Sequence, residues 1–287
     1  KRKINSTGVG LGLHARRILA YVVLIIVSFF CLFWFYVLFV NATRSNSNLQ
    51  SGFSVLPSSN LLSNWKHLLE KSGLPVIQGM LNSLIISTCS AVVCVYFSTM
   101  TAYAIHVYDF KLKKFIYPFI LAVMMIPTQV TALGFVNLVS DMNLEDSFIP
   151  LIIPQIAVPI TFFYMKQYME SSLPLSLVEA ARIDGSGEFR TFNHIVLPLM
   201  KPAIAVQAIF TFVSSWNNYF IPALILHDDS KKTLPILIAQ LRAADWLKFD
   251  MGQVYVMIAF SIFPVIVVYL ILSKHIVQGV ALGSVKG

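Results

Sequence analysis

Residues 18–40 read ILAYVVLIIVSFFCLFWFYVLFV, an apolar run that contains no Asp, Glu, Lys or Arg. An α-helix rises about 1.5 Å per residue, so about 20 apolar residues are needed to cross about 30 Å of hydrocarbon. The run is too long for the apolar core of a cleaved signal peptide, and no small-residue cleavage pattern closes it. These residues therefore predict a membrane-spanning helix.

Five further apolar runs follow, so the sequence predicts an all-α, polytopic membrane protein with six transmembrane helices. Of the 287 residues, 57% are hydrophobic and only 12% are charged, which agrees with this class. A membrane domain over residues 18–272 is expected between two tails, 1–17 and 273–287. The six runs are Ile18–Val40, Leu81–Ile105, Phe115–Val139, Ser147–Met165, Ala203–Leu226 and Gln253–Leu272.

The 21 Lys and Arg residues are distributed unevenly among the segments between the runs. The two tails and the loops 106–114 and 166–202 hold 14 basic and five acidic residues, and the other three loops hold seven and eight. Because Lys and Arg concentrate in cytoplasmic loops, both termini are predicted to be cytoplasmic. The net charge of +8 is then a topology signal, and nucleic-acid binding is not expected.

No Asp, Glu, Lys or Arg lies within a predicted run, whereas ion-driven carriers usually keep ionisable groups at membrane depth. The sequence has no GxxxxGK[ST] phosphate-binding loop and no GxSxG nucleophile motif. Its three cysteines and six histidines form no CxxC or HExxH pattern. No catalytic residue, metal or cofactor is therefore expected in this chain, and energy for uphill transport would have to come from another chain.

The loop 166–202 carries a helical pattern of its own. Pro174 is expected to begin a helix that ends at Gly185, and Ser186 is expected to cap a second helix that Pro198 and Pro202 break. The apolar stripe of the first helix is Leu177, Val178 and Ala181, and that of the second is Phe189, Phe192 and Val196. Two short helices at a glycine bend indicate a docking element; the alternative is an amphipathic hairpin on the lipid surface.

The residues Glu179-Ala-Ala, Gly185 and Ile195-Val-Leu-Pro198 form the pattern EAA(x)3G(x)9IxLP. This pattern resembles the EAA motif of the permease subunits of bacterial ABC importers. Further stretches resemble the carbohydrate-uptake permeases of the maltose MalG type, and the resemblance covers nearly the whole chain. These stretches are Asn82-Ser-Leu-Ile, Met124-Met-Ile-Pro127, Ser215-Trp-Asn-Asn-Tyr219, Thr233-Leu-Pro235 and Gly283-Ser-Val-Lys-Gly287.

The resemblance implies that the EAA loop is a coupling helix seated in a cleft of a cytoplasmic ATPase. Glu179 would be the charged contact, the two alanines would allow close approach, and the last three residues would pin the second helix. The implied coupling residues are Glu179, Ala180, Ala181, Asp184, Gly185, Ile195, Leu197 and Pro198. The tail residues Gly283, Ser284, Val285, Lys286 and Gly287 are implied to face the ATPase pair; the alternative is a frayed terminus.

Trp216, Asn217, Asn218 and Tyr219 combine aromatic faces with neutral amides, which suit stacking on a sugar ring and hydrogen bonding to its hydroxyls. Together with Asn82 they form the expected substrate path. The alternative for the four is an interfacial aromatic belt with amide contacts between helices. Prolines are expected to bend the spans at residues 127, 154, 159, 222 and 264.

The resemblance therefore implies a non-catalytic permease subunit of an ATP-driven importer for an oligosaccharide or another sugar. Its location would be the bacterial cytoplasmic (inner) membrane. The implied partners are a second permease in a heterodimer, two ATP-binding cassette subunits that hold ATP and Mg, an extracellular solute-binding protein and membrane lipid. Three alternatives remain at this stage: a permease for a non-sugar solute, a secondary carrier, and a membrane scaffold or receptor subunit.

Overall fold

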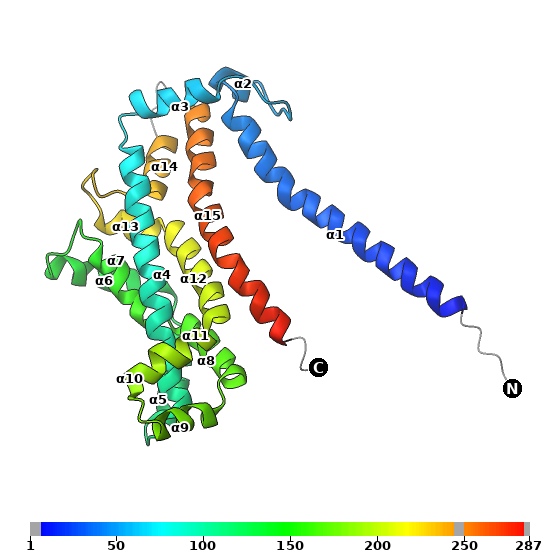
Figure 1. The fold of residues 1–287 in the computed structure, drawn as a ribbon. Helices are drawn as coiled ribbons and strands as arrows, with labels where there is room; N and C mark the ends of the chain where they lie inside the picture. The colour runs from blue at the N-terminus through cyan, green and yellow to red at the C-terminus, as the bar shows by residue number, and fades with distance from the viewer. Residues whose placement is uncertain (1–6, 244–249, 284–287) are drawn as a thin grey trace. The chain divides into compact units, whose positions relative to one another are not determined.

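The computed structural model describes residues 7–243 and 250–283, and every regular element in these ranges is a helix (Figure 1). The all-α expectation is thus confirmed. The chain divides into two compact units, Lys1–Ser72 with Ala244–Phe260 and Gly73–Ala243 with Ser261–Gly287. Helix α15 (Met251–Gly283) contributes its first turns to the first unit and its remainder to the second.

Four helices in the described ranges are long and apolar enough to cross a membrane, and they match the first, second, fourth and sixth predicted runs. They are Ala15–Ala42 within α1 (Thr7–Ala42), Val76–Val107 (α4), Ile149–Ser172 and Met251–Lys274 within α15. Two bent pairs qualify if each pair counts as one span, which gives up to six. In these pairs Lys113–Val123 meets Thr128–Asp141 at 97°, and Glu188–Leu199 meets Lys201–Trp216 at 81°.

The third predicted run is broken between α5 (Lys113–Val123) and α6 (Thr128–Asp141). Pro127 directly precedes α6 in an extended conformation, with ψ at 132°. Proline has no N–H and disfavours the helical conformation in the residue before it, so the ladder of α5 cannot continue into α6. The expected bend at Pro127 is present, and it is a break between two helices.

The fourth predicted run consists of α7 (Ile149–Ile152), the 3₁₀-helix η1 (Ile153–Ala157) and α8 (Pro159–Ser172). Helix α8 continues past Met165, where the run was expected to end. It does so because Met165 and Met169 are both fully buried on one face, while Lys166 pairs with Glu170 on another. The predicted loop 166–202 therefore begins with helix.

The first unit contains α1, α2 (Asn46–Gln50), α3 (Leu61–Glu70) and the first turns of α15. Its connections are held by side chains that bind backbone carbonyls. The amide of Asn64 donates to the carbonyls of Ala42 and Arg44 at 3.0 and 2.8 Å, and the buried Arg44 guanidinium donates to Gly52 at 2.8 Å. The bond to Ala42 satisfies the carbonyl of the last residue of α1, and the other two hold the chain that follows this helix.

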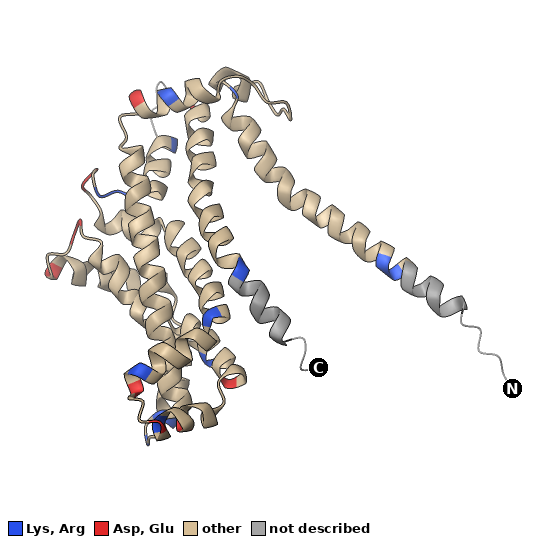
Figure 2. Ribbon diagram, viewed as in Figure 1, with Lys and Arg blue, Asp and Glu red and all other residues tan. Residues whose placement is uncertain are grey.

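In the second unit, α4 packs most extensively against α12 (Lys201–Trp216) and α8. The buried residues of α4 include many with small side chains, Ser83, Ser87, Ser90, Ala91, Cys94, Ser98 and Ala102. Small residues let helix backbones approach closely, which drives helix association in a membrane. Helix α4 carries no Asp, Glu, Lys or Arg, and Figure 2 shows it free of charged residues along its whole length.

Helix α14 (Leu234–Arg242) packs closely on α4 at Gly79. A Cβ atom at Gly79 would lie 2.4 Å from Cδ1 and 3.3 Å from Cγ of Leu237, which is fully buried. We expect Gly79→Ala to destabilise the protein by about 1–3 kcal/mol, the usual range for overpacking. The measurement is the unfolding temperature of the purified protein in detergent.

The matched control is Gly134→Ala in α6, where a Cβ atom would have nothing within 4 Å. Because alanine is a better helix former than glycine, the control should leave the unfolding temperature unchanged or raise it. Equal unfolding temperatures for the two variants would contradict the close approach of α4 and α14.

Candidate functional site

The segment that follows α8 folds into a two-armed hairpin. One arm is α9 (Leu175–Ile183); the other consists of α10 (Glu188–Thr191), the π-helix η2 (Phe192–Val196) and α11 (Leu197–Leu199). We call these elements the α9–α11 hairpin. Its apolar side joins a buried cluster with the last turns of α4 and with α8. The members are Ala102, Tyr103, Ile105, Phe162, Met165, Met169, Leu173, Val178, Phe192, Val196 and Met200.

A polar contact ties both arms of the hairpin to α4. Glu188 accepts a hydrogen bond from Nε of Arg182 at 2.8 Å on one carboxylate oxygen, and from the Tyr103 hydroxyl at 3.0 Å on the other. The Arg182 guanidinium also lies over the ring of Tyr108, 5.5 Å from its centroid. Because Arg182 lies in the last turn of α9 and Glu188 begins α10, this contact fixes the bend between the arms and also holds the hairpin on α4.

The structure brings several of the predicted coupling residues together. Ala181, Asp184, Gly185 and Ile195 line one hollow of about 330 Å³, together with Arg190 and His194. The remaining predicted residues lie on the outside of the hairpin or partly within it: Glu179, Ala180 and Pro198 are exposed, and Leu197 is half-buried. Of the predicted tail, Gly283 is the last residue of α15, and Ser284–Gly287 lie outside the described residues.

Two local predictions for the second arm are wrong. Ser186 does not cap it; α10 begins after Gly187, and the Ser186 hydroxyl instead accepts a hydrogen bond from Thr191 at 2.9 Å. Phe189 does not share the buried face of Phe192 and Val196, since it is 72% exposed. The helix begins later than expected, which places Phe189 in the first turn beside the bend, away from the buried cluster.

A cavity of about 560 Å³ lies among α4, α8 and α12. Its lining combines apolar side chains with neutral polar ones. The lining residues are Ser83, Ile86, Leu151, Gln155, Val158, Ile160, Thr161, Tyr164, Val206, Gln207, Phe210, Thr211, Ser214, Ser215, Asn218, Pro222 and Thr233. This volume lies within the range of about 300–1,000 Å³ that is usual for small-molecule sites.

Among the residues predicted for the substrate path, only Asn218 lines this cavity. Trp216 is buried and stacks on Phe212, with ring centroids 5.7 Å apart. Asn217 is exposed, and Tyr219 lines a separate hollow of about 370 Å³. The four consecutive residues point in different directions because they straddle the end of α12 at Trp216.

The sequence reasoning missed the polar residues of α12 that line the cavity, Gln207, Thr211 and Ser214. Together with Asn218 they recur at intervals of three or four residues in an otherwise apolar segment. Residues at that spacing lie on one face of a helix. The polar periodicity of this span was therefore the signal that identifies the cavity wall.

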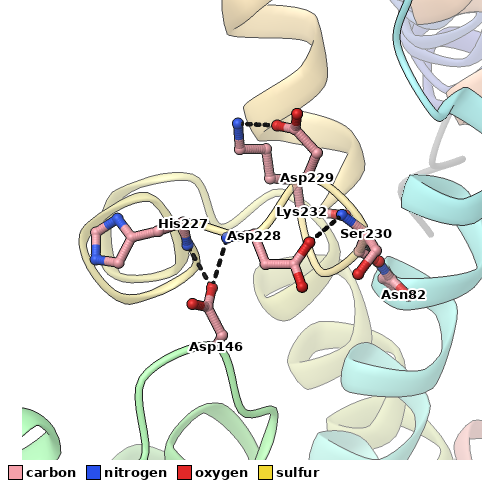
Figure 3. Close-up of polar contacts among 7 residues, drawn as sticks. All are labelled: Asn82, Asp146, His227, Asp228, Asp229, Ser230 and Lys232. Atoms are coloured by element: carbon pink, nitrogen blue, oxygen red, sulfur yellow. Dashed lines mark hydrogen bonds and ion pairs between the residues drawn. The ribbon is translucent and has the colours of Figure 1, made fainter.

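Asn82, the fifth predicted path residue, belongs to a polar network at the opposite end of α4 from the hairpin (Figure 3). Its amide donates to the carbonyls of Ser230 and Lys232, both at 2.9 Å, and its own carbonyl accepts from Gln78 at 2.9 Å. The side chain is 2% exposed and does not line the cavity. Asn82 thus holds the loop between α13 (Phe220–Ile225) and α14 on α4.

Asp146 holds the same loop from the other side. One carboxylate oxygen accepts hydrogen bonds from the backbone N–H of His227 at 2.6 Å and of Asp228 at 2.7 Å (Figure 3). Asp146 itself has a φ of 55°, and its N–H donates to Ile225 at 2.9 Å. We call these contacts, with those of Asn82, the loop latch, because they join the α6–α7 and α13–α14 connections to α4.

Asp228 stabilises the loop within the latch. Its carboxylate accepts from the backbone N–H of Ser230 at 2.8 Å, and this bond, followed by the Ser230 hydroxyl, lowers the pKa of Asp228 below its usual range. The stabilisation that the ionised Asp228 carboxylate gives to the folded loop is therefore present at neutral pH, and it is lost as the pH falls through the lowered pKa.

Across residues 7–243 and 250–283, no three His, Cys, Asp or Glu side chains gather as metal ligands would.

The fold and these sites define a multi-pass, all-helical membrane protein with a cavity lined by apolar and neutral polar side chains and with a surface hairpin. Residues 95–282 match the family described as the binding-protein-dependent transport system inner membrane component. The chain belongs to this family, and it is therefore a permease of the ABC transporter class and a multi-pass inner membrane protein.

Relatives of known name agree with this assignment. The chain is 36% identical to the arabinooligosaccharides transport system permease protein AraQ of Bacillus subtilis over 72% of each chain. It is 33% identical to AraQ of Halalkalibacterium halodurans over 85% of this chain and 86% of the relative. It is also 31% identical to the sn-glycerol-3-phosphate transport system permease protein UgpE of Yersinia pestis over 91% of this chain and 95% of the relative.

A solved structure supports the fold. A chain of a bacterial ABC transporter involved in the import of the acidic polysaccharide alginate superposes with a TM-score of 0.77 at 22% sequence identity. The match covers 96% of this chain and 99% of the other. The helical arrangement is thus shared even where the sequences have diverged.

Gly185 has a φ of 76°, a left-handed conformation, and a Cβ atom there would meet nothing within 4 Å. The conformation, rather than lack of space, therefore requires glycine. We expect Gly185→Ala to destabilise the folded bend of the α9–α11 hairpin by about 1–2 kcal/mol, so that the bend opens more often. Faster limited proteolysis between residues 182 and 190 is the measurement.

Gly187→Ala is the matched control, because Gly187 has a φ of −67° and equally open surroundings. The protease should cleave the Gly187→Ala variant at the same rate as the unchanged protein. Equally fast cleavage of both variants would show that the conformation of Gly185 does not decide the bend.

The loop latch gives a third prediction. Asp146→Gly keeps the left-handed conformation but removes the carboxylate, so we expect faster hydrogen exchange at the amides of His227 and Asp228. Asp146→Asn retains an acceptor oxygen and also tolerates the left-handed conformation, so most of the protection should return. Equal hydrogen-exchange rates at these two amides in both variants would show that the Asp146 carboxylate does not hold them.

Proposed function

We propose that this chain is a non-catalytic permease subunit of an ATP-driven sugar importer and forms half of its translocation path. Family membership supports the transport role, and the similarity to arabinooligosaccharide permeases supports a sugar as the solute. A second permease subunit, two ATP-binding cassette subunits that hold ATP and Mg, and an extracellular solute-binding protein complete the proposed assembly.

In the proposed topology six spans cross the membrane, one for each predicted run, with the bent pair α5–α6 as the third span and α12 with α13 as the fifth. The permease domain covers residues 18–272 and the tails 1–17 and 273–287 are cytoplasmic, as the excess of basic residues on one side indicates. The α9–α11 hairpin then lies at the cytoplasmic face, and the loop latch lies at the outer face.

The single observation that carries the coupling role is the outer surface of the hairpin. Glu179 is exposed, and Ile183 and Phe189 are 86% and 72% exposed on either side of the bend. Meanwhile the inner surface is fixed to α4 by Glu188 and the buried cluster. A rigidly held element with protruding apolar and acidic side chains suits transmission of a partner's movement to the membrane helices.

A permease for a non-sugar solute is the second candidate. It is favoured by the similarity to UgpE, whose name specifies sn-glycerol-3-phosphate, a phosphorylated polyol. The solute in the name of UgpE carries a phosphate, whereas the arabinooligosaccharides in the name of AraQ do not.

To test the coupling role, Glu179→Ala is compared with Glu170→Ala in the assembled complex. Both residues are exposed glutamates, and Glu170 lies on α8, outside the hairpin. Loss of a charged contact at a protein interface costs about 2 kcal/mol or more, so sugar-stimulated ATP hydrolysis should fall about thirtyfold in Glu179→Ala. Membrane insertion should be unchanged, and Glu170→Ala should hydrolyse normally. Normal stimulated hydrolysis in Glu179→Ala would rule out its role in coupling.

A further inference from the structure

We propose that the cavity among α4, α8 and α12 is a binding subsite for an uncharged polyhydroxyl ring, with the Thr233 hydroxyl as one of its ligand-binding groups. The inference rests on the proposed function, because it assigns a solute class to this subunit's part of the translocation path. It also separates the neutral-sugar candidate from the phosphorylated one.

Thr233 supplies the observation that points to a ligand. The residue lines the cavity and is 4% exposed, and its hydroxyl has no hydrogen-bond partner in the part of the chain that the structure describes. A buried hydroxyl without a partner costs about 1–3 kcal/mol, so such groups are rare unless something binds them.

The helix cap explains why this hydroxyl is free. Thr233 is the N-cap residue of α14, where a threonine side chain usually accepts from the first turn, but it makes no such bond. The Ser83 hydroxyl of α4 instead accepts from the N–H of Leu234 at 2.8 Å. The second residue of α14, Pro235, has no N–H, and the N–H of the first, Leu234, is bound to Ser83. Neither can bond the Thr233 hydroxyl, which remains available to a molecule in the cavity.

The remaining polar groups of the cavity are amides and hydroxyls. Gln207 and Thr161 are 7% and 2% exposed, and Asn218 lies at one end of the row on α12. Amides and hydroxyls both donate and accept hydrogen bonds, as sugar hydroxyls do. The aromatic rings of Tyr164 and Phe210 also line the cavity and offer apolar faces to a sugar ring.

The cavity is poorly suited to an anion. All of its lining residues are uncharged, so neither Lys nor Arg stands in the wall to pair with a phosphate or carboxylate. Moving an ionised group from water into such a site costs several kcal/mol unless it is paired. A phosphorylated solute would therefore bind there much more weakly than its neutral parent.

The test measures protection of a cysteine in the cavity. Ser214, an exposed residue of the lining, is replaced by cysteine after Cys31, Cys89 and Cys94 have been replaced by alanine. The assembled complex in detergent is then treated with a neutral thiol reagent in the presence of glucose or of glucose 6-phosphate. We expect millimolar glucose to slow labelling and the phosphate ester to have at least tenfold less effect. Equal protection by both sugars, or protection by neither, would overturn the proposal.

The role of Thr233 is tested in the same background with Thr233→Val, which removes the hydroxyl and keeps the shape. One hydrogen bond is worth about 1 kcal/mol, so the half-protecting concentration of glucose should rise about fivefold. Ser87→Ala is the matched control, because the Ser87 hydroxyl is equally buried and unpartnered but does not line the cavity. An unchanged half-protecting concentration in Thr233→Val, or an equal rise in both variants, would show that the Thr233 hydroxyl does not bind the ligand.

Failure here is distinguishable from failure of the proposed function. ATP-driven uptake of a sugar by the unmodified complex, combined with labelling of the Ser214→Cys variant that glucose does not slow, would refute the subsite and leave the transport role standing. Protection by glucose in a complex whose sugar transport does not respond to ATP would instead refute the importer and leave the subsite.

Discussion

The structure depends on one constraint, that hydrocarbon cannot form hydrogen bonds with a polypeptide. Every backbone group in the membrane must be satisfied within the protein, and charges must stay near the water. Helix α4 meets both conditions: it runs from Val76 to Val107 without a break and without a charged residue. Where a helix does break, as at Pro127, the backbone leaves the ladder at a residue that has no N–H to satisfy.

The same constraint explains how α4 organises the second unit. Its small side chains let α8 and α12 approach, and two of its polar side chains bind other segments near its two ends. Asn82 binds backbone carbonyls of the α13–α14 connection near one end, and Tyr103 binds Glu188 of the α9–α11 hairpin near the other. One straight helix thus connects the loop latch, the cavity wall and the hairpin, an arrangement suited to a membrane protein whose two faces respond to each other.

The lengths of apolar runs and the spacing of motif residues could be interpreted without the structure. Apolar run length placed the helices, and the spacing of Glu179, Gly185 and Pro198 identified the hairpin and the family. Runs that contain an internal proline were less predictable, because composition does not say whether a helix bends or stops. The face of a short helix was also uncertain: Phe189 has the right spacing to be buried, but it lies beside the bend, where the buried cluster does not reach.

The sequence by itself determined that the chain is helical and that it belongs in a membrane, because hydrophobicity acts residue by residue. Only the tertiary structure decided what individual polar residues do. Asn82 and Thr233 are both neutral, buried and near the first turns of α4 and α14, yet one is fully hydrogen-bonded and the other has a free hydroxyl beside a cavity. Asn82 lies beside backbone carbonyls of the α13–α14 connection, whereas Thr233 is followed by Pro235, which has no N–H, and by the Leu234 N–H, which is bound to Ser83, 151 positions away in the chain. Such contacts depend on which helices are neighbours, and local sequence does not contain that information.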